Sequence, residues 1–268
     1  MKTKSALIPL SNFIRSTAES MKSVTETSAS IYAAPNIIEC KHCNKVIKSV
    51  KSSTAGDWYY PNFNMHNRLC RRCEKIENIE KHLETAGVPP KYYNSTFESF
   101  DVNNFNRKTY DFCKNYTLQK KFDIGLFLFG PCGVGKTHLA ISVIREMLLN
   151  NRNVFFISTP NLLFQLRKTF STSVTTTDEE QLRKYLSYSF LVLDDLGTEK
   201  WSEWVQQTLD HIIYQRDAHA MPAIITSNLA LNQIQSRYGD RIVSRITGMS
   251  HVLKLTGADH RLIQRKKL

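Results

Sequence analysis

The sequence predicts an α/β fold: a parallel five-stranded sheet flanked by helices, preceded by a small module that carries cysteines. Two observations lead to this expectation. From residue 124 onward, short apolar segments alternate with helical segments, and four of the six cysteines form two C-x-x-C pairs near the N-terminus. We expect a flexible arm at residues 1–35, a zinc-binding module with an exit helix at 36–85, and the larger domain at 86–268.

Charge and hydropathy narrow the classes of partner. The formal net charge of +12 favours an acidic partner, with nucleic acid first, although a merely soluble basic surface has the same charge. No stretch approaches the roughly 20 apolar residues of a membrane span. The apolar run at residues 6–10 is too short for the core of a signal peptide. We therefore expect a cytoplasmic protein with no membrane partner.

The paired cysteines predict a metal site. Each C-x-x-C places two thiolates on one tight turn, and two such turns brought together make a tetrahedral site for zinc. A redox role needs one active pair beside a βαβ pattern, which this stretch lacks. A full thiolate set leaves no open position, so the zinc would be structural. The ligands we expect are Cys40, Cys43, Cys70 and Cys73, with His42 and His66 as possible replacements for a cysteine.

A lead-in segment separates the module from the sheet. The Gly/Pro cluster at residues 87–90 marks a boundary, and the aromatic residues at 91–100 are expected to pack on the next domain. Residues 104–122 fit an amphipathic helix, in which Cys113 would be an inert core thiol. The apolar side of this helix would use Phe105, Tyr110, Phe112, Cys113, Tyr116 and Leu118.

Five apolar segments are expected to form the sheet. Their near-continuous hydrophobicity suits strands that are buried on both faces of a parallel sheet. Helices are expected between them, at residues 138–150 and 181–187 among others. The predicted strands are residues 124–129, 154–158, 190–194, 223–227 and 252–256.

A glycine-rich loop joins the first of these strands to a helix and matches the pattern G-x-x-x-x-G-K-[ST]. In that context backbone N–H groups cradle phosphate oxygens at a helix N-terminus. Lys136 would reach the β- and γ-phosphates, and the Thr137 hydroxyl would ligate magnesium. The loop predicts binding of a nucleoside triphosphate by Gly130, Pro131, Cys132, Gly133, Val134, Gly135, Lys136 and Thr137.

Polar side chains follow two of the predicted strands, at the edge where ligands bind in parallel sheets. Adjacent side chains on a strand point apart, so the two acids after one strand can have different tasks. Asp194 would hold magnesium through its water shell, and Asp195 would orient or deprotonate the attacking water. Asn228, after another strand, would help to position that water.

Basic residues supply two further predictions. Arg241 and Arg245 lie four apart on one face of a helix, and Arg261 follows near the end of the chain. An arginine that reaches a γ-phosphate from a neighbouring subunit stabilises the transition state, although each arginine alone also fits a solvated surface. A candidate patch for single-stranded DNA comprises Phe164, Arg167, Lys168 and Phe170, unless the two phenylalanines belong to the core.

With these pieces in order, residues 86–268 resemble the AAA+ ATPases, specifically the helicase-loader branch typified by DnaC and DnaI, which includes the transposition helper IstB. The resemblance rests on residues 88–97, 130–137, 191–197, 226–228 and 239–245. It implies Mg²⁺-dependent hydrolysis of ATP, with Asn228 as sensor 1 and Arg261 as sensor 2. It also implies an arginine finger acting in trans, Arg245, with Arg241 as its rival.

The same resemblance implies a function in DNA replication. The cysteine module is similar to the zinc-bearing helicase-binding domain of DnaI-type loaders, although arginines beside its second cysteine pair would also suit nucleic acid. We expect subunits that assemble head to tail, hold single-stranded DNA and load a hexameric replicative helicase. The alternatives are a transposition helper that acts on duplex DNA and a phage-type helicase adaptor with little turnover.

Overall fold

The computed structural model describes residues 37–51, 58–61, 63–66, 68–119, 121–171 and 183–261, apart from the side chains of 51, 58, 59 and 168–171. The expected arm at 1–35 lies outside these residues, as does the start of the helix expected at 181–187. The chain forms two compact units that divide between Asn78 and Ile79. We expected the module to reach residue 85, but helix α3 (Ile79–Thr85) packs on helix α5 (Lys136–Leu149) of the larger unit.

The described residues of the small unit form three short antiparallel strand pairs and one helix. A core this small buries few apolar side chains, chiefly Ile47, Tyr60 and Leu69 beside the cysteines. The pairs are β1 (Ile37–Glu39) with β2 (Val46–Lys48), β3 (Val50–Lys51) with β4 (Trp58–Tyr59), and β5 (Phe63–Asn64) with β6 (Leu69–Cys70), followed by α2 (Arg71–Glu77).

The larger unit contains the predicted parallel five-stranded sheet, in the order β11-β7-β10-β9-β8. The last strand was predicted two residues too far toward the C-terminus. Its ladder ends where Lys254 pairs with Phe129, just before the glycine-rich loop. The strands are β7 (Gly125–Phe129), β8 (Val154–Ser158), β9 (Phe190–Leu196), β10 (Ala223–Ser227) and β11 (Ser250–Lys254).

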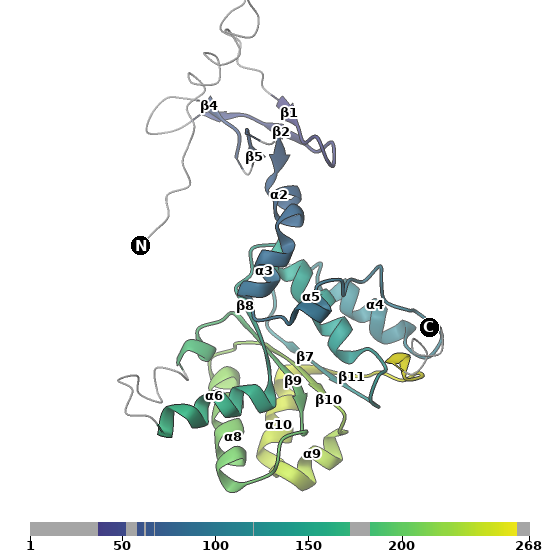
Figure 1. Cartoon of the computed structure of the whole chain (residues 1–268), viewed down its shortest axis with the longest axis vertical. Helices are drawn as coiled ribbons and strands as arrows, with labels where there is room; N and C mark the ends of the chain where they lie inside the picture. Colours follow the sequence, from purple (N-terminus) through teal and green to yellow (C-terminus); the bar gives the residue numbers. More distant parts are fainter. Residues whose placement is uncertain are drawn as a thin grey trace, which may run out of the picture. The chain divides into compact units, whose positions relative to one another are not determined.

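Helices cover both faces of the sheet, which makes a three-layer unit (Figure 1). Successive side chains of β7 face opposite sides of the sheet: Leu126 and Leu128 pack in one core and Phe127 packs in the other. One layer contains α3, α4 (Arg107–Tyr116) and α5, with the 3-10 turn η1 (Pro90–Tyr92) between α3 and α4. The other contains α6 (Thr159–Ser171), α8 (Glu203–Ala218), α9 (Leu231–Tyr238) and α10 (Asp240–Met249).

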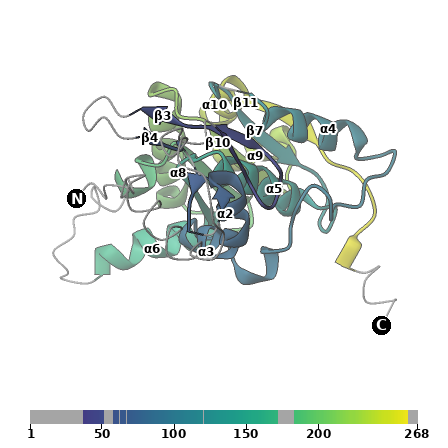
Figure 2. The same ribbon diagram turned by 90° about the horizontal axis from the view of Figure 1, so that it is seen from above.

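Helix α4 lies at the β11 end of the sheet and α6 at the β8 end (Figure 1), and Figure 2 shows α4 and α6 on opposite sides of the larger unit. The helix predicted at 104–122 is shorter than expected. Phe105 and Leu118 are therefore not part of its apolar side, and their side chains are 76% and 77% exposed. Cys113 is a core thiol as predicted, and burial raises its pKa to about 12.

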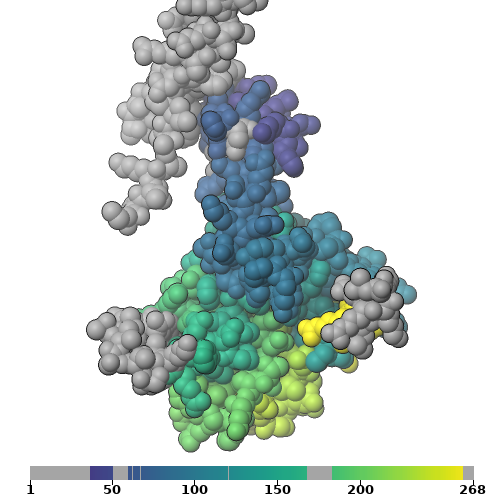
Figure 3. Space-filling model, viewed as in Figure 1, coloured from purple at the N-terminus to yellow at the C-terminus, as the bar shows by residue number. Residues whose placement is uncertain are grey.

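The lead-in segment, residues 87–100, packs against the start of α5, since Phe97 and Phe100 share a core with Leu139. In the space-filling view the blue atoms of this part of the chain lie at the surface of the larger unit (Figure 3). The ring of Phe100 stacks on Tyr110, and a Cβ added to Gly135 would lie 2.6 Å from that Phe100 ring. Nε2 of His138 lies 2.8 Å from the carbonyl oxygen of Thr96. These contacts fix the first turn of the helix that follows the glycine-rich loop.

No helix in the described part of the chain combines the length and apolar character that crossing a bilayer requires.

Candidate functional site

The glycine-rich loop lies between β7 and α5, at the carboxyl ends of the parallel strands. Gly133 and Gly135 have φ angles of 75° and 98°, which glycine adopts without strain. The N–H of Gly130 donates to the carbonyl of Ser227 at 3.2 Å, which holds the loop against the end of β10. The loop therefore occupies the position in which a phosphate can lie against the N-terminus of α5.

Lys136 is buried beneath this loop with 5% of its surface exposed. Its Nζ donates to the carbonyls of Gly130 at 2.9 Å and Pro131 at 2.7 Å, and to Oδ1 of Asn228 at 2.6 Å. Burial lowers the pKa of Lys136, although Asp194 and Asp195 act to raise it. The structure thus brings together the loop lysine and the asparagine that the sequence separates by 92 positions.

Asp194 lies beside the same loop and is almost fully buried. Its Oδ1 accepts hydrogen bonds from the hydroxyls of Thr137 at 2.8 Å and Thr226 at 2.6 Å. Burial raises the pKa of Asp194. A hydroxyl and a carboxylate at the mouth of a phosphate loop are the hard oxygen ligands that magnesium prefers, so this donor set fits the ion.

Asp195 is half-buried and follows Asp194 at an irregularity of β9. The register of β9 against β10 shifts here, since Ile225 lies opposite Leu193 and Ser227 opposite Leu196. Asp195 takes a φ of 58° at this bulge. Bulges re-aim side chains beside active sites, and this one sets the backbone from which the Asp195 side chain leaves β9.

The three arginines have different surroundings. Arg245 on α10 forms an ion pair with Asp210 of α8, and its guanidinium lies 4.8 Å from the centre of the Tyr214 ring. Arg241, one turn earlier, is exposed. Neither arginine is hydrogen-bonded to the phosphate loop of its own chain among the interactions of the described residues.

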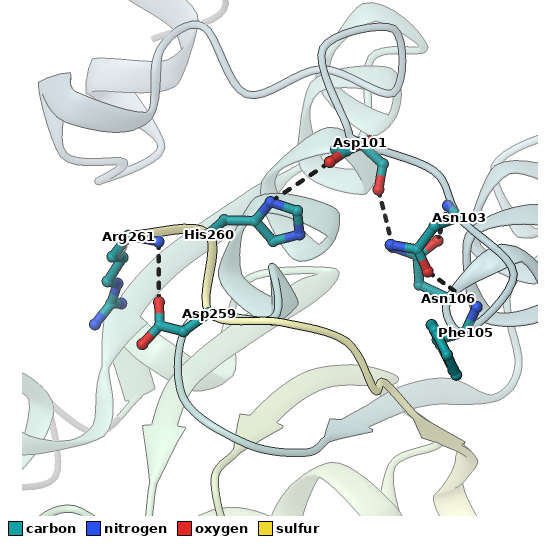
Figure 4. A network of polar contacts seen from close by, with 7 residues as sticks. All are labelled: Asp101, Asn103, Phe105, Asn106, Asp259, His260 and Arg261. Carbon is teal, nitrogen blue, oxygen red and sulfur yellow. Dashed lines mark hydrogen bonds and ion pairs between the residues drawn. The ribbon is translucent and has the colours of Figure 1, made fainter. Parts of the chain in front are cut away.

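Arg261 belongs to a segment that is hydrogen-bonded to the phosphate loop. Figure 4 shows this segment with Asp259, His260 and their partners. The N–H of His260 donates to the carbonyl of Gly133 at 3.1 Å, and Nδ1 of His260 lies 3.7 Å from Oδ2 of Asp101. The N–H of Arg261 donates to Oδ1 of Asp259 at 2.9 Å. A Cβ added to Gly133 would lie 1.8 Å from Oδ1 of Asp259, so this carboxylate fills the space that the glycine leaves.

Comparison with known proteins agrees with this geometry. The sequence profile of the family described as IstB-like ATP binding protein matches residues 67–268. The chain belongs to this family. The replicative helicase loader DnaC of Escherichia coli K12 is 25% identical over 178 residues, which are 65% of this chain and 72% of that protein.

Two solved structures share the fold of this family member. The crystal structure of the DnaC helicase loader superposes with a TM-score of 0.57 at 27% identity, over 63% of this chain and 100% of that one. The crystal structure of DnaI gives a TM-score of 0.56 at 25% identity, over 65% of this chain and 94% of that one. The predicted AAA+ architecture is therefore confirmed.

The cysteine cluster of this IstB-like protein forms a second candidate site. The four sulfurs lie within 4.8 Å of one another, and the sulfurs of Cys43 and Cys70 are 3.7 Å apart. Tetrahedral zinc with thiolates at about 2.3 Å needs sulfurs about 3.8 Å apart, so the cluster fits this ion. Backbone N–H groups overcome the effect of burial and lower the pKa of Cys40 to about 6, which favours the thiolate. His42 and His66 are exposed and outside the cluster.

The candidate DNA patch is only partly described. Phe164 is 57% exposed and thus not part of the core, and the guanidinium of Arg167 lies 5.3 Å from the centre of the Trp204 ring. The side chains of Lys168 and Phe170 lie outside the described set. The patch stays a prediction.

Sequence reasoning missed three residues that contact the site: Thr226, Asp259 and Glu199. Thr226 occurs in a stretch that the resemblance quotes, but an apolar strand gives no sign that its hydroxyl faces the acids. The carboxylate of buried Glu199 accepts the N–H of Gly197 at 3.1 Å and the hydroxyl of Tyr238. It thereby ties the loop after the two acids to the end of α9.

Proposed function

We propose that this protein is an ATPase that hydrolyses ATP to ADP and phosphate with magnesium. The observation that carries this proposal is the convergence of Lys136, Thr137, Asp194 and Asn228 at one edge of the sheet. Backbone N–H groups of the phosphate loop would hold the phosphates, and Lys136 would exchange its carbonyl partners for phosphate oxygens. Thr137 and Asp194 would hold the ion, which neutralises charge on the β- and γ-phosphates when bound.

Asp195 and Asn228 would act on the attacking water. Asp195 orients the water or accepts its proton while the water oxygen bonds to the γ-phosphorus, and the bond from that phosphorus to the bridging oxygen breaks. Asn228, already hydrogen-bonded to Lys136, would hold the water in line with that bond. Turnover is expected to rise when subunits and DNA assemble.

Head-to-tail assembly would complete each site. Arg245 is the proposed arginine finger, which acts on the site of the neighbouring subunit, and Arg241 is its rival. Arg261 is the proposed sensor 2, which approaches the γ-phosphate bound by its own subunit. Arg245 would have to leave Asp210, whereas Arg241 is exposed already. A mixing experiment tests this arrangement. Each variant alone should lack turnover. When Arg245→Ala is mixed with Lys136→Ala, the first supplies an intact phosphate loop and the second an intact finger, so turnover should return. The same experiment with Arg241→Ala in place of Arg245→Ala tests the rival.

The cellular function we propose is loading of a replicative helicase onto single-stranded DNA. Its support is the similarity to DnaC and DnaI together with a zinc-compatible module ahead of the ATPase unit. The module would bind the helicase. The patch around Phe164 and Arg167 would contact the DNA strand.

The test is deposition of the host's hexameric helicase on circular single-stranded DNA. Wild-type protein with ATP should load it, and Lys136→Ala should not. Two alternatives predict other results. A transposition helper, which the family also suggests, would bind duplex DNA in an ATP-dependent manner and load nothing. A helicase adaptor would bind the helicase and ATP but show negligible turnover.

A further inference from the structure

Thr226 contacts both acids of the candidate ATPase site at once. It is fully buried on β10, beside the end of β9. Its hydroxyl donates to Oδ1 of Asp194 at 2.6 Å and accepts the backbone N–H of Asp195 at 2.9 Å. A threonine hydroxyl has one hydrogen to donate, and here that hydrogen is committed to Asp194 while a lone pair serves Asp195.

The bulge in β9 explains why a side chain, and not a backbone carbonyl, accepts the N–H of Asp195. Between Ile225 and Ser227 the strand β10 has one residue, Thr226, whereas β9 has both Asp194 and Asp195 between the matching partners. An extra residue in a bulge disrupts the regular ladder. The Thr226 hydroxyl accepts the N–H of Asp195 at this point and so supports the φ of 58° at Asp195.

Thr226 also acts with Thr137 on the other acid. Both hydroxyls donate to the same oxygen of Asp194, and they come from two different elements: Thr137 from the start of α5 and Thr226 from β10. Two donors on one carboxylate oxygen fix the rotation of the carboxylate. A hydrogen bond to a ligating carboxylate orients it and tunes the metal.

We propose that Thr226 is the positioning residue that sets Asp194 for magnesium and Asp195 for the attacking water. This inference rests on the proposed ATPase function. It assigns Thr226 a role that acts through Asp194 and Asp195. It also separates the task of Thr226 from that of its neighbours, since Ser227 donates to the carbonyl of Leu196 at 2.6 Å and contacts neither carboxylate.

The test compares Thr226→Val, which keeps the shape and removes the hydroxyl, with Thr226→Ser, which keeps the hydroxyl. The affinity of the full chain for a fluorescent ATP analogue is measured with magnesium and with EDTA. In Thr226→Val the gain in affinity caused by magnesium should fall by about tenfold or more, while affinity in EDTA stays within about twofold of wild type. Turnover should fall by a similar factor, and Thr226→Ser should keep both quantities within about threefold.

Ser227→Ala is the matched control, because it removes a neighbouring hydroxyl from the same strand and should retain the magnesium gain. Thermal unfolding shows whether each variant folds, and Thr226→Ala takes the place of Thr226→Val if the valine variant does not. A normal magnesium gain without the hydroxyl, or an equal loss in Thr226→Ser, would overturn the proposal. Wild-type protein with a magnesium gain but no turnover contradicts the ATPase function alone; wild-type protein with no magnesium gain overturns the positioning role.

Discussion

Nζ of Lys136 and Oδ1 of Asn228 lie 2.6 Å apart and join the phosphate loop to the end of β10. The lysine belongs to the first turn of α5, and the asparagine follows the central strand of the sheet. This bond gives the two residues separable tasks, since the lysine has two carbonyl partners besides the amide.

Replacement of these two residues should therefore have different effects. Lys136→Ala removes the positive charge that phosphates contact, and nucleotide affinity should fall by about 100-fold or more. Asn228→Ala should leave affinity within about threefold and lower kcat by about 10- to 100-fold. Isothermal titration and steady-state turnover measure the two quantities. Asn232→Ala on the exposed side of α9 is the control, and an equal loss of affinity in both site variants would contradict the separation.

Removal of the metal should unfold the small unit only. Its core contains few apolar side chains, so the thiolate–metal bonds must contribute much of its folding free energy. We expect one bound zinc per chain by atomic absorption, lost in Cys40→Ser and retained in Cys132→Ser. Nucleotide affinity should stay unchanged after removal of zinc with a zinc-selective chelator in excess magnesium, because the two units are compact separately. Zinc retained at wild-type content in Cys40→Ser would refute the site.

Arg216 should be important for stability rather than for activity. It is 1% exposed, and its guanidinium donates to the carbonyls of Tyr188, Ser189 and Pro222 at 3.2, 3.2 and 2.9 Å. Burial lowers its pKa to about 10. Arg216→Met leaves these carbonyls without their donor and should lower the free energy of unfolding by about 2–4 kcal/mol.

Urea denaturation measures this loss. Arg107→Met, at the exposed start of α4, is the control and should change the free energy of unfolding by less than about 0.5 kcal/mol. A loss in Arg216→Met no larger than in this control would show that the buried guanidinium contributes nothing.

His138 should make stability depend on pH. Burial lowers its pKa below the usual 6.5, although the bond to Thr96 acts in the opposite direction. The folded state therefore favours the neutral ring, and its contribution is complete above pH 6.5 and lost as the pH falls below that value. The free energy of unfolding should fall more steeply from about pH 7.5 to 5.5 in wild type than in His138→Gln. The same slope in both proteins would contradict the role of His138. His211→Gln, at an exposed position of α8, is the control and should keep the wild-type slope.

The sheet and the candidate nucleotide site could be predicted from sequence because their signals are local. A continuous apolar run predicts a buried strand, and the spacing from Gly130 to Thr137 predicts a phosphate loop without knowledge of the fold. Two strands, 154–158 and 223–227, were predicted with the bounds that the structure has. The cysteine pairs were equally local, and their sulfurs converge as expected.

Other features depend on tertiary register and left no local signal. The role of Thr226 arises from a bulge between two strands, and a bulge has no sequence pattern here beyond a pair of acids. The contact of Asp259 with Gly133 depends on where the chain returns after β11. The helix around Cys113 was predicted too long, because Phe105 and Leu118 continue an apolar pattern without packing on the core.

Capture of the host's replicative helicase is the measurement that bears most directly on the proposed loading function. Full-length protein loaded with zinc should retain the helicase in a pull-down, and a Cys40→Ser/Cys43→Ser variant should lose it while still binding ATP. Cys132→Ser, which leaves the zinc ligands intact, should capture normally. No capture by the zinc-loaded wild type, together with tight ATP-dependent binding to duplex DNA, would contradict helicase loading and favour the transposition helper.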